Sequence, residues 1–192
     1  MKNFLRDHSY TSMIVLVNQI AIAIVGMTLS LACSMAGNDT LRIICSVFAT
    51  VFYLFLVYTK VWDIGAKDSV SVEYGHKEYK PWTGLWIGLL AAVPNFILAI
   101  GTMLGYLLPN SSFFGNLGAS CKMIALFAEG MYSGLLALRI GNTHLNSYWI
   151  SFFIIPLPAI LTCAAAYYFG LKEKKFTRLF ELQHGTGKKN KK

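Results

Sequence analysis

Long uninterrupted runs of apolar residues dominate this chain and leave few folds open to it. Four such runs cover residues 13–34, 41–59, 85–108 and 148–170. Because an α-helix rises 1.5 Å per residue, about 20 residues cross the roughly 30 Å of hydrocarbon in a bilayer. Only 14% of the 192 residues are charged, which is too few to cover a soluble domain of this length. The sequence therefore predicts an all-α fold, a polytopic integral membrane helical bundle.

A fifth apolar run, at residues 116–138, differs from the others because it holds Lys122 and Glu129. A charged residue at the centre of an inserted helix costs about 2.5–3.5 kcal/mol. This run is therefore only a marginal transmembrane span.

The distribution of basic residues distinguishes two topologies. If all five runs cross, seven basic residues lie on one side of the membrane and nine on the other. If residues 116–138 do not cross, fourteen share the side of both termini, and only Arg42, Lys122 and Arg139 face the other side. Cytoplasmic loops carry an excess of lysine and arginine. We therefore expect four transmembrane helices plus a fifth re-entrant or interfacial helix, with the N- and C-termini in the cytoplasm. Five full spans is the alternative.

A polar connector follows the second run. Residues 60–84 carry four acidic and four basic side chains, so their net charge is zero. Residues 69–74 alternate small polar and larger side chains, which predicts a short strand. We expect a solvated connector that docks a partner protein through four charged residues: Asp63, Lys67, Asp68 and Glu73.

Five polar residues in the apolar runs are candidate cavity or ion contacts: Asn18, Gln19, Asn95, Lys122 and Glu129. Polar groups at membrane depth are costly, and they often mark a substrate or ion path. Asn95 follows Pro94, which lacks a backbone N–H and frees a carbonyl on the preceding turn. The alternative role is packing through interhelical hydrogen bonds, which are worth about 0.6–2 kcal/mol.

Small residues favour a tightly packed bundle. Three glycine pairs have GxxxG spacing, namely Gly84–Gly88, Gly101–Gly105 and Gly130–Gly134. This spacing lets helix backbones approach closely, within one chain or in a homo-oligomer. The four cysteines are scattered without metal-ligand spacing, so we expect them to pack as small apolar residues, and we expect no metal or cofactor.

The last segment, residues 171–192, is basic. Its first half has an apolar helical face, which predicts an amphipathic helix on the inner membrane surface. Its lysines would attract anionic lipid headgroups at about 1 kcal/mol each. Because the basic residues gather at membrane flanks, their charge does not indicate nucleic-acid binding.

Two functions remain open. The first is a non-enzymatic subunit or transport-related protein of the cell membrane, with a cytoplasmic connector that docks a partner. The second is an intramembrane enzyme that acts on a lipid. The sequence contains no nucleotide-binding motif and no catalytic constellation of serine or cysteine with histidine. The first function is therefore preferred.

Overall fold

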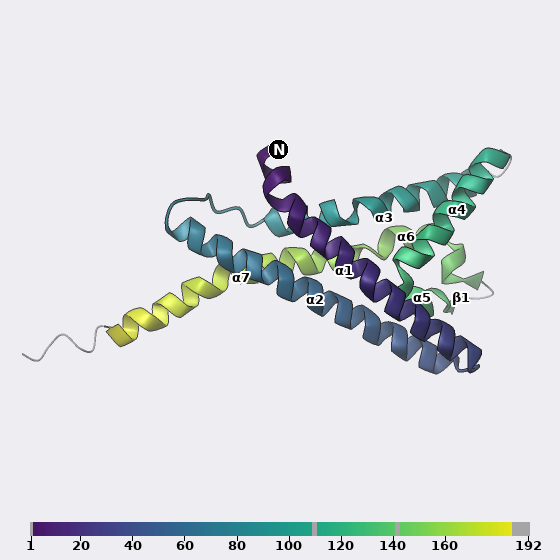
Figure 1. The fold of residues 1–192 in the computed structure, drawn as a ribbon, viewed down its shortest axis with the longest axis horizontal. Coiled ribbons are helices and arrows are strands. Elements are labelled where there is room, and N and C mark those ends of the chain that lie inside the picture. The colour runs from purple at the N-terminus through teal and green to yellow at the C-terminus, as the bar shows by residue number, and fades with distance from the viewer. Residues whose placement is uncertain (1, 109–110, 141–142, 186–192) are drawn as a thin grey trace, which may run out of the picture.

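Four long helices form a single bundle (Figure 1). The structure, a computed structural model, describes residues 2–108, 111–140 and 143–185. The long helices are α1 (Lys2–Met35), α2 (Asp39–Glu73), α3 (Thr83–Leu107) and α7 (Leu157–Gly185).

The bundle has two distinct ends (Figure 1). Residues 74–82, which join α2 to α3, lie at one end, and we name this the connector end. The turn at residues 36–38 and the short ladder of β1 (Arg139–Ile140) and β2 (Thr143–His144) lie at the other, which we name the hairpin end. α1 and α3 run toward the hairpin end, whereas α2 and α7 run back toward the connector end.

Four segments are long and apolar enough to cross a membrane: Ser9–Met35, Asp39–Glu73, Thr83–Leu107 and Ser151–Lys172. Their outer faces expose large apolar side chains such as Phe48, Phe55 and Leu161, as expected for contact with lipid. A fifth apolar helix, α4 (Ser112–Ala128), is shorter. These features confirm the predicted all-α bundle of four spanning helices and a distinct fifth helix.

α2 extends well beyond the predicted span. Its 35 residues correspond to about 52 Å of helix, longer than the roughly 30 Å of bilayer hydrocarbon. The strand predicted at residues 69–74 is wrong, because these residues continue α2 as far as Glu73. The helix ends where Gly75 adopts a φ of 73° and His76 N–H donates to Ser71 O at 2.9 Å. Such a left-handed glycine cap terminates many helices.

The last apolar run contains a break. α6 (Ser151–Ile154) is followed by Ile155 and Pro156, and α7 begins at Leu157. Proline cannot donate a backbone hydrogen bond and its ring collides with the carbonyl four residues earlier, which explains the interruption. α7 then continues into the predicted tail as far as Gly185. The tail lysines at residues 188–192 lie outside the described residues.

The fifth helix belongs to a segment that enters and leaves the bundle at the hairpin end. α4 runs antiparallel to the second half of α3, and the chain then turns through η1 (Gly130–Tyr132) and α5 (Ser133–Leu136) back to the β ladder (Figure 1). α3 and α4 approach each other closely at Gly105 and Gly118. A Cβ added to Gly118 would lie only 2.6 Å from Gly105 Cα. We name residues 112–136 the re-entrant segment. The bundle then continues through η2 (Leu145–Ser147).

Candidate functional site

The tip of the re-entrant segment is held by α1 and α2 halfway along the bundle. A Cβ added to Gly130 would lie 2.5 Å from Ala23 O, so only glycine allows this approach to α1. On the α2 side, Ser46 Oγ donates to Met131 O at 2.6 Å and accepts from Leu135 N–H at 3.4 Å. The GxxxG pair of this segment, Gly130–Gly134, therefore packs within the chain.

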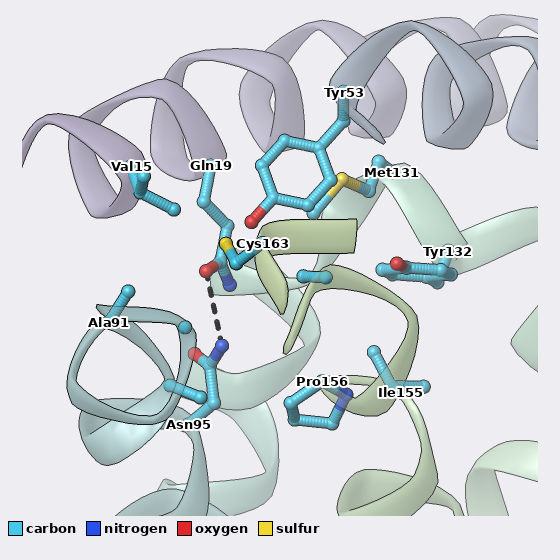
Figure 2. A pocket seen from close by; sticks show the side chains of 13 residues that line it. Val15, Gln19, Tyr53, Ala91, Asn95, Met131, Tyr132, Ile155, Pro156 and Cys163 are labelled. Carbon is cyan, nitrogen blue, oxygen red and sulfur yellow. Dashed lines mark hydrogen bonds between the residues drawn. The ribbon is translucent and has the colours of Figure 1, made fainter. Parts of the chain in front are cut away.

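Two of the predicted polar residues meet at this tip (Figure 2). Asn95 Nδ2 donates to Gln19 Oε1 at 3.1 Å, and Gln19 Nε2 donates to Ala128 O at 3.3 Å. Asn95 is the central residue of α3, with twelve helical residues on each side. Gln19 therefore connects the middle of α3 to the last residue of α4. Both amides are buried, and each contact replaces hydrogen bonds to water that the site excludes.

Glu129 is the C-cap residue that follows α4, and it is only 1% exposed. Its backbone N–H donates to Ala125 O at 2.8 Å, but its side-chain Oε2 makes no hydrogen bond within the described part of the chain. Glu129 lies outside the four spanning segments. Burial raises the pKa of its carboxyl above the usual range of a glutamate, because the low-dielectric surroundings disfavour the charged form.

Three more buried oxygens have no hydrogen-bond partner among the described residues. Tyr132 Oη and Ser133 Oγ belong to the turn of the re-entrant segment, and Thr50 Oγ1 belongs to α2. Burial raises the pKa of the Tyr132 hydroxyl, and the Glu129 carboxylate adds to this effect through its charge. A buried polar atom without a partner typically costs about 1–3 kcal/mol. Three of the four atoms belong to Glu129, Tyr132 and Ser133, so the unpartnered polar groups are concentrated at the turn of the re-entrant segment.

A small cavity lies beside the tip, between α1, α2, α3 and α7 (Figure 2). Its volume of about 10 Å³ is close to the space that one water molecule needs. Gln19 and Asn95 line it together with apolar residues and the rings of Tyr53 and Tyr132. We name it the central cavity. Sequence reasoning missed both tyrosines, because an aromatic residue in an apolar run gives no sign of which side its hydroxyl faces.

A larger cavity of about 440 Å³ opens at the hairpin end, and we name it the hairpin-end basin. It is lined by Asp39, Arg42, Ile43, Gly134, Ala137, Leu138, Arg139 and His144. The re-entrant segment contributes to both cavities, since Met131 and Tyr132 line the central cavity and Gly134 and Ala137 line the hairpin-end basin.

The remaining predicted cavity residues lie elsewhere. Asn18 is half-buried next to Gln19, but it does not line the central cavity. Lys122 lines a separate cavity of about 170 Å³ with Asn146 and Trp149. The structure therefore groups Gln19, Asn95 and the Glu129 turn, and it places Lys122 apart from them. Whether any of these residues contacts a solute stays a prediction.

Of the four predicted docking residues, Asp63, Lys67 and Asp68 form ion pairs within the chain. Lys67 and Asp63 form an exposed ion pair at 2.7 Å along α2. Asp68 is buried, and its carboxylate accepts from Lys77 Nζ at 2.6 Å and from Tyr167 Oη at 2.9 Å. Asp68 thereby ties the connector to α7. Both carboxylates therefore form ion pairs with lysines of this chain.

The described residues contain no group of three or more His, Cys, Asp or Glu side chains that could hold a metal ion. Fold and site together describe an α-helical bundle of four spanning helices with a re-entrant segment that turns back at mid-depth. The chain matches no family model, and no curated protein and no solved structure is significantly similar to it. The functional assignment therefore depends on the residues of this chain alone.

Proposed function

We propose that the protein is a membrane transport protein, or the membrane subunit of a transport complex, in which the re-entrant segment gates a polar path. The observation that carries this proposal is Glu129, a buried carboxyl with an unpartnered oxygen at the turn of the segment. A buried acidic side chain at membrane depth destabilises the fold, so its presence is explained best by a functional role. A proton or small cation that visits the site would satisfy the carboxyl and explain its presence.

The two cavities support a gated path. Tyr132 lines the central cavity and Gly134 lines the hairpin-end basin, so a single residue of the segment, Ser133, lies between the two linings in sequence. Broken helices that line a cavity are tolerated inside a membrane when the surrounding protein satisfies their backbone. Gln19 and Ser46 provide such bonds here, to Ala128 O and Met131 O. A shift of the tip would break these two bonds and join the cavities.

The charge distribution supports one orientation of the bundle. The connector end holds most of the basic residues, which favours its placement in the cytoplasm together with both termini. Its exposed Asp63–Lys67 pair then faces the cytoplasm, where it would contact a partner protein. The orientation is tested by tags at the two termini, whose accessibility to protease is compared in sealed vesicles.

Proton flux into liposomes tests the transport role. The purified protein is reconstituted into vesicles that hold a pH-sensitive dye, and a potassium diffusion potential drives protons inward. We expect flux above that of protein-free vesicles, and its loss in Glu129→Gln, which keeps the shape of the side chain but cannot exchange a proton. Glu78→Gln is the matched control, because Glu78 is an exposed carboxylate that pairs with Lys80 at the connector end. Equal rates for the wild type and Glu129→Gln, or no flux in the wild type, would contradict the proposal.

A further inference from the structure

The hairpin-end basin is lined by two arginines that form no ion pair with an acidic side chain among the described residues. It contains two of the three basic residues of this end, Arg42 and Arg139, and also His144. Its one carboxylate, Asp39, is exposed in the first turn of α2, where the helix dipole favours it. Neither arginine forms a salt bridge with any side chain that the structure describes. Two guanidinium groups therefore line one cavity, and Asp39, the carboxylate that lines it with them, forms an ion pair with neither.

Local structure fixes the positions of these groups. Arg139 and His144 are directly paired across the β ladder, so their side chains lie next to each other on one face of it. His144 Nδ1 lies 2.8 Å from Ala137 O, and because a carbonyl can only accept, Nδ1 carries the hydrogen. This bond orients the imidazole ring and leaves Nε2 as its remaining polar atom.

Arg42 is held from the other side. Its Nε donates to the buried Ser30 Oγ at 2.8 Å, which leaves the two terminal nitrogens of the guanidinium for another acceptor. The close contact of Gly134 with Arg42 O sets α5 against the first turns of α2, next to this side chain. The basin thus has one arginine on α2, one on β1 and a space of about 440 Å³ between the elements, a volume typical of small-molecule sites.

We infer that the hairpin-end basin is a binding site for a small oxyanion, a carboxylate or phosphate group that Arg42 and Arg139 hold together. Planar guanidinium groups match the oxygens of these anions and bind them by paired, charge-assisted hydrogen bonds. The phosphate of a lipid headgroup and that of a free solute offer the same chemistry to this site. The inference does not depend on proton transport through Glu129, because it concerns equilibrium binding at one end of the bundle.

Binding measurements on the full chain in nanodiscs test the inference. In discs of the zwitterionic lipid phosphatidylcholine, inorganic phosphate is titrated by calorimetry. In a second series, spin-labelled phosphatidylglycerol is added, and the fraction of immobilised label is measured. Phosphate binding would identify a free solute as the natural ligand class, whereas retention of phosphatidylglycerol alone would identify the headgroup. Either result supports the oxyanion site if the arginine variants remove it.

Arg139→Gln is the principal variant, because Arg139 is exposed and its loss leaves the helices intact. We expect affinity to fall about 10- to 100-fold, as for the loss of a hydrogen bond to a charged group. Arg42→Gln should have at least the same effect, and size-exclusion chromatography verifies its folding, since it also loses the bond to Ser30. Lys122→Gln is the control, a basic residue that lines a different cavity.

Two outcomes would overturn the inference. The first is the absence of binding in both series. The second is an affinity in Arg139→Gln equal to that of the wild type, or reduced by the same factor in Lys122→Gln, because binding would then reflect only the general positive charge of the chain.

Discussion

Replacement of Tyr167 by phenylalanine removes the hydroxyl that hydrogen-bonds to Asp68 and to Thr83 at the connector end. Tyr167 Oη donates to Asp68 Oδ2 at 2.9 Å, and the two residues are separated by 99 positions in the sequence. The Asp68 side chain is 11% exposed, so water replaces the lost donor poorly. The phenylalanine ring fills the same space, and the change therefore isolates the hydroxyl.

The magnitude follows from the charge of the acceptor. A hydrogen bond to a charged group contributes about 1.5–3 kcal/mol. Lys77 still binds Asp68 Oδ1 at 2.6 Å in the variant, which leaves the carboxylate neutralised. We therefore expect the lower end of this range, a loss of about 1.5 kcal/mol in the free energy of unfolding.

Unfolding by sodium dodecyl sulfate in mixed micelles, followed by circular dichroism, measures this loss. Tyr168→Phe is the matched control, since Tyr168 is the adjacent residue and is 38% exposed. It should stay within about 0.5 kcal/mol of the wild type. The combined Tyr167→Phe and Asp68→Asn variant should be less destabilised than the sum of the two single variants, because both remove one interaction. If the Tyr167→Phe protein is as stable as the Tyr168→Phe protein, the hydrogen bond from Tyr167 to Asp68 does not stabilise the fold and this prediction is wrong.

Three further predictions concern other parts of the bundle. Because the folded state raises the pKa of Glu129, it binds that proton more tightly than the unfolded state does. The thermal stability of the protein should therefore be highest below the ordinary pKa of a glutamate, and it should fall as the pH rises through the raised pKa of Glu129. In a series of melting curves at different pH, Glu129→Gln should flatten this dependence. Cys33 Sγ and Cys45 Sγ lie 3.8 Å apart, so copper–phenanthroline should link them, and mass spectrometry of the digest should show the joined peptides. Gly118→Val should destabilise the chain by about 1–3 kcal/mol in the same detergent assay, since its side chain meets Gly105; unchanged stability would contradict the close crossing of α3 and α4.

The sequence was sufficient for the number of spanning helices and for the distinct character of the fifth run. Apolar length and the count of basic residues carry this information, since both are local properties. The end of α2 was not predictable in this way. Residues 60–73 are polar enough to resemble a loop, and their helix depends on α7, through the close contact of Gly65 with Tyr167 O and the bond from Ser69 Oγ to Leu171 O at 3.0 Å.

The site was predictable in part. Gln19, Asn95 and Glu129 were selected because polar residues stand out in apolar runs. The sequence could not show that Gln19 binds both Asn95 and Ala128 O, since these contacts join residues 76 and 109 positions apart. The hairpin-end basin was missed for a related reason. Arg42 and Arg139 were counted only as topology signals, and the β ladder that brings one of them beside His144 is two residues long in each strand.

The path of the re-entrant segment has a consequence for how the protein is made. α4 leaves the ribosome before α6 and α7, yet Met131 and Tyr132 face the cavity wall to which Ile155 and Cys163 contribute. During synthesis the segment has no completed crevice to enter, and exposed backbone at its turn is not tolerated in lipid. We therefore expect the segment to insert after translation. Until α7 has been synthesised the segment would remain at the membrane surface, and α7 would then pack against it.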